Sequence, residues 1–452
     1  MMVFSIAVID ILLVINSLIF VVVFILFGFI SVKEKEFRAA GIFVVAGFLF
    51  LSLAVLVGVF GGVLLKWVFI LTPFILILVL FLPWGSKFEE EDSFPSGRID
   101  ERDVMFSRRL LREGTVRYEA YYSRSPDKKL KDDHFREKPG LLSKNTLFYD
   151  PMMFAAADAG FQTVAALATE VDAEEKPEKV EIPADKLSLF IKNWGKQLGA
   201  TSVGVTMIKD YHLYSYRGRD HNYDKPVEKE HSFAIAFTVE MDKVNMDTAP
   251  RGPTVMESAR KYMDAGSIAV QISWFIRNLG YEARAHIDGN YEVVCPLVAR
   301  DAGLGEIGRM GLLMTPDLGP RVRIGVVTTS LELETDERVP DHSVIDFCER
   351  CKKCALVCPS KAISFSGKQT IDGIKRWQIN QESCYDYWCS AGTDCGRCVS
   401  VCPYSHPDNL LHSVVRYGIR KSLLFRMIAV PLDDLFYGKK PVPKPVPDWM
   451  KV

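Results

Sequence analysis

Histidine and cysteine are both missing from long parts of this 452-residue chain. The first histidine is His134, and only Cys295 of the ten cysteines lies outside the interval from Cys348 to Cys402. Cysteines gathered in so short a stretch argue against a framework of disulfides and indicate metal ligands, so we expect a reducing compartment. The formal net charge of −1 gives no electrostatic footprint for nucleic acid, so no nucleic-acid partner is expected.

Charge is missing from most of the first 84 residues. The segment 11–30 has no charged residue, and the segment 41–84 has only Lys66. The first is long enough to cross a hydrocarbon core once, and the second is long enough to cross it twice. We therefore predict a membrane anchor over residues 1–84, with three transmembrane helices at about 3–31, 40–61 and 63–83. A cleaved signal peptide would have a shorter apolar core and a small-residue cleavage site.

The charges that flank these helices predict the orientation of the anchor. With three crossings, the loop holding Lys33, Lys35 and Arg38 lies on the same side as the rest of the chain, and the opposite side offers only Lys66. The positive-inside rule then places the soluble part in the cytoplasm, at the inner membrane; a count of two helices would reverse this. Without histidine the anchor has no axial haem ligands of that type, so it is either a plain anchor or a docking surface for a partner subunit.

Composition divides the remaining chain into four parts. Residues 85–150 are rich in charge, begin with proline and glycine, and are predicted to be a linker and a segment that wraps the core. Residues 151–335 alternate amphipathic helical patterns, as at 186–199 and 258–280, with buried strands at 200–208 and 232–240, which indicates an α/β (α+β) catalytic domain. Residues 336–412 hold the cysteines, and 413–452 are predicted to be a C-terminal tail.

The spacing of the cysteines predicts two iron–sulfur clusters. Cys348, Cys351, Cys354 and Cys358, followed by proline, match the bacterial ferredoxin run C-x2-C-x2-C-x3-C-P. In that run the first three cysteines bind one [4Fe–4S] cluster and the fourth binds the other. Zinc sites use two pairs of ligands and have no need of the proline. Residues 336–412 are therefore predicted to form a bacterial ferredoxin-like module with two clusters.

The second cysteine run is shorter and leaves one ligand to be found. Either Cys384 or Cys389 has to complete the set of eight. We prefer Cys384, with Cys389 as a buried spectator. The first cluster is then assigned to Cys348, Cys351, Cys354 and Cys402, and the second to Cys358, Cys384, Cys395 and Cys398. Because two adjacent clusters conduct electrons, we expect the electrons to reach a site formed by residues 151–333.

From about residue 98 to 412 the chain resembles the corrinoid-dependent reductive dehalogenases. The resemblance rests on "FIRNLGYEA" at 275–283, on "DAGLGEIGRMGLLMTPDLGPRVRI" at 301–324 and on the unequal cysteine runs. Epoxyqueuosine reductase shares the "AGLG-x-IG" element and the cysteines, but "LLMTPDLGPRVR" is closer to the dehalogenases. The resemblance implies a nitroreductase-like core that binds base-off cobalamin beside the nearer cluster and replaces the halide of an organohalide by hydrogen.

The resemblance also implies a catalytic pair. A tyrosine that donates a proton and a basic residue that tunes it are matched here by Tyr262 and Arg323. An adjacent guanidinium stabilises phenolate and would bring the pKa of the tyrosine nearer to working pH. From the sequence alone, Tyr262 on an apolar helix is more typical of a packing residue. Near the substrate the family often has asparagine where this chain has Asp288, with Asn290 two residues later, and Trp388 matches a pocket aromatic or a core tryptophan.

One motif points elsewhere, and three functions stay open. "DYHLYS" at 210–215 approaches the D-x-H-x-x-G element that supplies a cobalt ligand in other corrinoid proteins, but Ser215 replaces the glycine, so we expect His212 to be polar surface. The candidate functions are a membrane-tethered reductive dehalogenase, a corrinoid reductase of another carbon–heteroatom bond, and a non-catalytic electron carrier. Each requires an electron donor, which the sequence does not specify.

Overall fold

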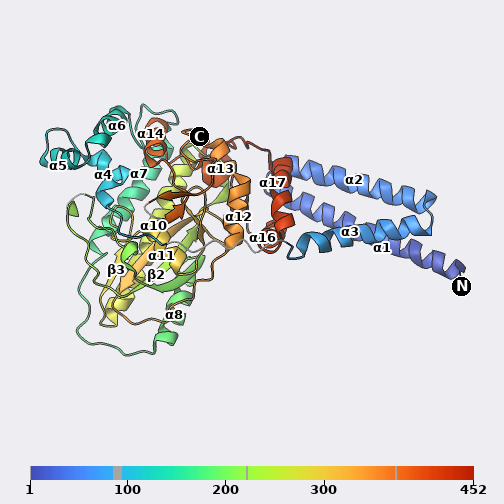
Figure 1. The fold of residues 1–452 in the computed structure, drawn as a ribbon, viewed down its shortest axis with the longest axis horizontal. Helices are drawn as coiled ribbons and strands as arrows, with labels where there is room; N and C mark the ends of the chain where they lie inside the picture. The colour runs from blue at the N-terminus through green and yellow to red at the C-terminus, as the bar shows by residue number, and fades with distance from the viewer. Residues whose placement is uncertain (1, 85–93, 220–221, 372–373, 452) are drawn as a thin grey trace. The chain divides into compact units, whose positions relative to one another are not determined.

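The computed structural model describes residues 2–84, 94–219, 222–371 and 374–451. The chain forms two compact units (Figure 1). The first combines Met1–Phe88 with Asp408–Pro441, and the second combines Glu89–Pro407 with Val442–Val452. Segments from both ends of the sequence therefore meet within one unit.

The N-terminal part of the first unit consists of three apolar helices, as predicted. They are α1 (Met2–Lys33), α2 (Phe37–Phe60) and α3 (Val63–Phe81). Each is long and apolar enough to span a membrane, by length and composition, over Val8–Lys33, Phe37–Phe60 and Val63–Phe81. Most of their large apolar side chains stay exposed, which is the arrangement expected of helices whose solvent is lipid.

Two further helices complete the first unit. They are α16 (Leu410–Lys421) and α17 (Leu423–Tyr437), joined at Ser422, whose hydroxyl caps α17 by accepting from the Phe425 N–H at 3.2 Å. Phe436 stacks on Phe43 of α2 with ring centres 4.9 Å apart. Residues 413–452 are predicted from the sequence to be a tail, and the composition gives no signal for these two helices or their packing.

The second unit is built around a four-stranded antiparallel sheet. The strand order is β1-β2-β6-β3, with β1 (Ser202–Met207), β2 (Phe233–Glu240), β6 (Val322–Thr329) and β3 (Ala283–His286). Alternate residues of β2 enter two different apolar cores: Ile235 and Phe237 join one, and Ala234 and Ala236 join the other. Because both faces of β2 are covered, the strand reads as a continuous buried run rather than an alternating one.

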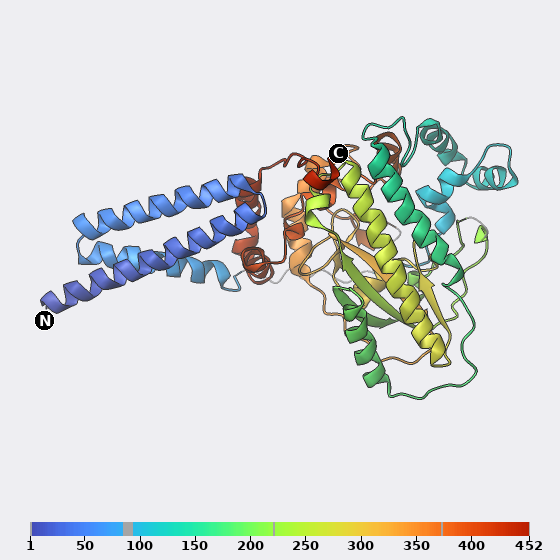
Figure 2. The same cartoon turned by 180° about the vertical axis from the view of Figure 1, so that it is seen from behind.

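Helices cover the two faces of this sheet. On one face lie α7 (Pro151–Ala166), α8 (Ala184–Gln197) and the long α10 (Gly252–Asn278), and on the other lies α11 (Cys295–Asp301). Figure 2 shows α10 and α7 running alongside each other across the sheet. The helix α10 ends just before Gly280, whose φ of 85° is left-handed, as the predicted C-terminal position requires.

The cysteine-rich segment follows the sheet as short elements. They are α12 (His342–Cys351), α13 (Lys353–Val357), the hairpin strands β7 (Gln369–Ile371) and β8 (Ile374–Arg376), α14 (Gln381–Ala391) and α15 (Arg397–Ser400). The segment predicted to wrap the core contains α4 (Met105–Leu110), α5 (Val116–Arg124) and α6 (Pro126–Glu137). Three smaller elements lie between the main ones: α9 (Lys243–Met246), β4 (Glu306–Ile307) and β5 (Leu313–Met314).

Candidate active site and cluster sites

Four of the predicted cluster ligands surround one small cavity. Cys348, Cys351, Cys354 and Cys402 line a space of about 20 Å³. The chain brings the first three together by ending α12 at Cys351 and starting α13 at Lys353, with Lys352 between them at a left-handed φ of 55°. Burial and the neighbouring cysteines raise the pKa of the Cys402 thiol well above its ordinary value. Thiols in such surroundings ionise when a metal binds them, so this set suits a cluster.

The other four predicted ligands line a different and larger cavity. Cys358, Cys384, Cys395 and Cys398 form one side of it. The left-handed residues Cys395 and Gly396, with φ of 60° and 70°, turn the chain so that Cys395 and Cys398 both reach this wall. Burial and then Cys395, Cys354 and Cys384 raise the pKa of Cys398 well above its ordinary value. Because Cys354 belongs to the first set, the two sets are adjacent.

The structure separates the two cysteines that the sequence left as alternatives. Cys384 and Cys389 both lie on α14, five residues apart, so their side chains point roughly 140° away from each other on the helix. Cys384 faces the larger cavity, whereas Cys389 is fully buried in an apolar cluster with Met105 and Phe135. The arrangement supports Cys384 as the eighth ligand.

The larger cavity, called the central cavity below, has a volume of about 340 Å³. The rest of its lining is mainly aromatic and apolar and includes Tyr214, Tyr262, Tyr291 and Trp388. Cofactor and substrate sites are typically spaces of this kind, with a few polar groups in an apolar wall. The polar groups here include Arg323 and Asp394.

Tyr262 and Arg323 meet at this wall. The Cζ atom of Arg323 lies 4.4 Å from the centre of the Tyr262 ring. The Nη2 atom of Arg323 donates to Ser258 Oγ at 2.6 Å and to Asp394 Oδ2 at 3.0 Å, and Ser258 Oγ also donates to Asp394. Tyr262 and Ser258 come from α10 and Arg323 comes from β6, so the packing of helix on sheet fixes the pair.

The pKa of Tyr262 differs from the sequence prediction. Arg323 lowers the pKa as expected, but burial and the carboxylates of Asp288 and Asp394 raise it, and the sum lies above the ordinary value of 10. The prediction that Arg323 would bring the pKa of Tyr262 nearer to working pH is therefore wrong, although the direction of the effect of Arg323 itself is as predicted. The physical reason is that Asp394 offsets the charge of Arg323, while burial disfavours the phenolate. Tyr262 accordingly keeps its proton at neutral pH.

Asp288 lies close to this pair. It occupies the turn after β3, next to Gly289 with φ of 74°. Its carboxylate acts on the pKa of both Tyr262 and Tyr291, and burial, which outweighs Arg219 and Arg323, raises its own pKa. Asp288 does not itself line the central cavity.

Asn290 is directed elsewhere. Its Oδ1 atom accepts from Arg284 Nη2 at 2.8 Å and also from Arg217. Both arginines also bind Glu292, at 3.0 and 2.7 Å. The structure thus brings Asn290 to a pair of buried arginines at the base of the Asp288 turn and not to the wall of the central cavity. Trp388, by contrast, does line that cavity.

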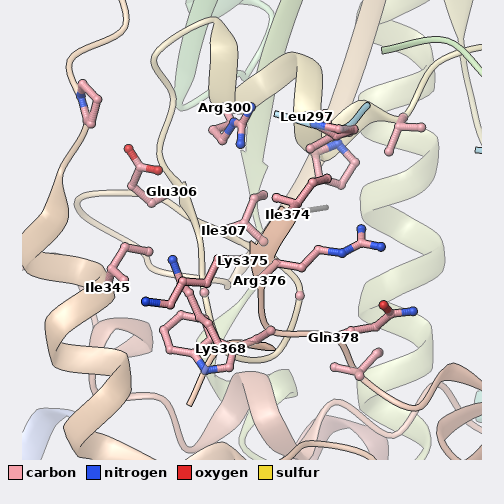
Figure 3. A pocket seen from close by; sticks show the side chains of 18 of the residues that line it. Leu297, Arg300, Glu306, Ile307, Ile345, Lys368, Ile374, Lys375, Arg376 and Gln378 are labelled. Carbon is pink, nitrogen blue, oxygen red and sulfur yellow. The ribbon is translucent and has the colours of Figure 1, made fainter. Parts of the chain in front are cut away.

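A second cavity, of about 350 Å³, is strongly basic (Figure 3). Arg300 enters it from α11, and Lys375 and Arg376 enter it from β8. Pro296 and Ile379 line both this cavity and the central one, so the two spaces share a wall. Sequence reasoning missed this basic cavity because its cations are far apart in the chain and no motif joins them.

His212 is buried and not at the polar surface, which corrects the sequence prediction. Its Nδ1 atom accepts from the Lys209 N–H at 3.1 Å, and its Nε2 atom lies 3.1 Å from Asp301 Oδ2, so Nε2 carries the proton. Burial lowers its pKa. Asp301 also accepts from Arg300 Nε at 3.0 Å, and Arg300 lines the second cavity. The buried histidine therefore helps to position the carboxylate that holds Arg300.

Sequence reasoning also missed residues in the central cavity. Asp394 directly precedes Cys395, and Tyr291 directly follows Asn290, but neither belongs to a recognisable spacing. The only signal for Asp394 is a carboxylate inside the cysteine-rich segment. Tyr214, from a loop far from the cysteines in the chain, gives no signal at all.

Comparisons with known proteins agree with these features. Residues 347–406 match the 4Fe-4S dicluster domain family. The chain is 30% identical over 307 residues to the tetrachloroethene reductive dehalogenase of Sulfurospirillum multivorans, which is 60% of this chain and 60% of that protein. A solved reductive dehalogenase, described as B12-dependent, superposes with a TM-score of 0.58 and 26% identity over 68% of this chain and 46% of the other.

A more distant similarity is found to the epoxyqueuosine reductase of Lactococcus garvieae, with 30% identity over 117 residues, covering 25% of this chain and 32% of that protein. The predicted resemblance to the reductive dehalogenases is thus confirmed, together with their fold and a C-terminal 4Fe–4S domain. The chain nevertheless spans less than two thirds of the length of the dehalogenases that it matches.

Proposed function

We propose that the protein is a membrane-anchored reductive dehalogenase. It would take two electrons and one proton, replace the halide of an organohalide by hydrogen and release the halide ion. The observation that carries this proposal is that Tyr262 and Arg323 line the same cavity as Cys358, Cys384, Cys395 and Cys398. A proton donor and the end of an electron path therefore face one space.

The two sets of cysteines define the electron path. We assign one [4Fe–4S] cluster to Cys348, Cys351, Cys354 and Cys402 and the other to Cys358, Cys384, Cys395 and Cys398. Only the second set lines the central cavity, so electrons from a donor of unspecified kind would enter at the first cluster and leave from the second. The adjacency of Cys354 and Cys398 supports transfer between them.

The two cavities suit a base-off cobalamin held in a nitroreductase-like core. When bound, such a cofactor supplies low-valent cobalt for reductive removal of the halide. The central cavity offers an apolar wall beside the second cluster, and the second cavity offers cations for a phosphate-bearing nucleotide tail. One donor that lines the second cavity, Trp377 Nε1, is buried without a hydrogen-bond partner, which fits a cavity made for a polar group.

The residues of this chain would then divide the work at the central cavity. The hydroxyl of Tyr262 donates the proton to the carbon that loses the halide. Arg323, held by Ser258 and Asp394, stabilises the phenolate that remains. Trp388 and Tyr291 contribute the apolar wall against the substrate, and Asp288, which does not line the cavity, acts through its charge on Tyr262 and Tyr291.

The anchor is proposed to place the second unit in the cytoplasm, at the inner membrane. Lys33, Lys35 and Arg38 are exposed around the loop between α1 and α2. At the other end of the helices the basic residue is Lys66, which is paired with Asp10 at 2.6 Å. Three basic residues at one end against one at the other support this orientation.

The decisive experiment measures halide release by protein that was purified without oxygen and reconstituted. The cofactor content should be about eight irons and one corrinoid, as two cubanes and one cobalamin require. A panel of halogenated alkenes and aromatics should then release halide only with a strong reductant. Full cofactor content without halide release from any substrate would contradict the function, whereas iron for a single cluster would contradict the ligand assignment.

A further inference from the structure

The helices α16 and α17, called the C-terminal hairpin below, expose a continuous apolar surface. On α16 the exposed residues Leu410, Val414 and Tyr417 follow the spacing i, i+4, i+7 and therefore share one face. On α17 the exposed apolar residues are Met427, Pro431, Leu432 and Leu435, which also share a face. Soluble proteins rarely leave such contiguous apolar surface in water.

Contacts within the first unit place this hairpin at one end of the three apolar helices. His412 Nε2 lies 3.1 Å from Glu34 Oε2, just beyond the end of α1. Phe436 stacks on Phe43 near the start of α2. At the end of α3, Phe81 contacts Phe425 with ring centres 5.2 Å apart. All three contacts lie at the same end of the three helices, which is the end where the loop between α1 and α2 is found.

Exposed charge around the hairpin is mainly positive. Seven exposed cations belong to the same end of the unit: Lys33, Lys35, Arg38, Arg420, Lys421, Lys439 and Lys440. Among the described acidic residues of this end, only Asp408 is exposed. Lys421 also lies over the Tyr417 ring, 5.9 Å from its centre. Tyrosine beside lysine, with exposed apolar side chains and exposed cations on the same hairpin, is the composition of a helix that lies in a membrane interface.

We propose that the C-terminal hairpin lies in the headgroup region of the bilayer and binds anionic phospholipids. Its apolar side chains enter the boundary with the acyl chains, and its cations meet the phosphates of the anionic surface. This proposal rests on the proposed membrane anchor, because it continues the lipid-facing surface of α1–α3. The membrane attachment then has two parts, the spanning helices and a helical hairpin more than 300 residues later in the chain.

Photocrosslinking of the full chain in vesicles tests the position of the hairpin. A diazirine amino acid is placed at Met427, which is 54% exposed, and the vesicles contain phosphatidylcholine and phosphatidylglycerol. Val44 on α2, 68% exposed, is the positive control, and Leu130 on α6, 83% exposed, is the negative control. We expect lipid adducts at Met427 and Val44 and none at Leu130.

The other outcomes are separable. Adducts at Val44 with crosslinks from Met427 to residues 94–407 or to a second polypeptide would overturn the proposal and leave the anchor intact. Absence of adducts at Val44 as well would overturn the membrane anchor itself. The double variant Lys439→Gln/Lys440→Gln tests the charge. Phosphatidylglycerol should be enriched among the Met427 adducts of the parent chain and at least twofold less so in the variant, and equal shares in both would overturn the binding of anionic lipid.

Discussion

The guanidinium of Arg323 lies over the face of the Tyr262 ring, with its carbon 4.4 Å from the ring centre. A cation over the ring is attracted to the π system by about 0.5–2 kcal/mol and gains more when the ring becomes a phenolate. The donors of Arg323 are meanwhile directed at Ser258 and Asp394. In the proposed function this arrangement would stabilise the charge that develops on Tyr262 when it gives up its proton.

The replacement Tyr262→Phe should abolish most of the turnover. The ring and its volume remain, so both clusters and the corrinoid should bind as before, but the proton donor is lost. A positioned general acid contributes about 10²–10⁴-fold, and the rate of halide release should fall by that factor. Near-normal turnover would show that the proton comes from elsewhere, with Asp288 as the next candidate and an epoxyqueuosine-reductase-like chemistry as the favoured alternative.

Arg323 should act on the rate through the phenolate rather than through folding. Arg323→Ala should approach the rate of the Tyr262 variant, and Arg323→Lys should be intermediate because it keeps a charge but loses the planar group. The direction of the pH dependence follows from the raised pKa of Tyr262: the acid form is complete below that pKa and is lost only above it. Turnover of the parent protein should therefore show no alkaline loss from this group below about pH 10.

The parts of the site that a local motif encodes were predictable from the sequence, and the parts that depend on distant contacts were not. The glycine after α10 is local and has the left-handed φ expected of it. The spacing of the cysteines is also local, and the segment 347–406 matches a 4Fe-4S dicluster family. Asn290 was a substrate candidate through the family resemblance around Asp288, and its contact with Arg217, 73 residues away, could not be read from the sequence. His212 was misplaced for the same reason, since its partner Asp301 is 89 residues away.

The choice between Cys384 and Cys389 can be tested by iron content. Cys384→Ser should remove a ligand of the second cluster, so iron should fall from about eight to about four per chain. Cys389→Ser is the matched control on the same helix, because its side chain lies in an apolar cluster and not at the central cavity. The opposite pattern would reverse the assignment.

Arg309 should raise the reduction potential of the first cluster. Its guanidinium is almost fully buried, donates from Nε to the Cys348 carbonyl at 3.0 Å, pairs with the half-buried Glu349 at 2.9 Å and lies over the Trp377 ring. Buried positive charge and hydrogen bonds beside a cluster favour its reduced state. Arg309→Met should lower the midpoint potential of the first cluster and leave the second nearly unchanged, as measured by potentiometric titration with electron paramagnetic resonance. Arg309→Lys, which keeps the charge, should shift it less; equal shifts in both clusters would contradict a local effect.

Asn290 should position Asp288 rather than bind substrate. Its Oδ1 atom accepts from Arg217 and Arg284, two buried arginines that also bind Glu292. Asp288 lies in the same turn, two residues before Asn290. Asn290→Ala would leave both donors one partner short, at a cost of about 1–3 kcal/mol, and should lower the thermal midpoint of the protein. Because the turn loosens, kcat should fall while KM changes little for every substrate alike. Asp288→Asn is the control: it removes a charge that raises the pKa of Tyr262, so it should change the pH dependence of kcat without lowering the thermal midpoint. If Asn290→Ala instead raises KM for one substrate class and leaves the midpoint unchanged, Asn290 contacts substrate after all.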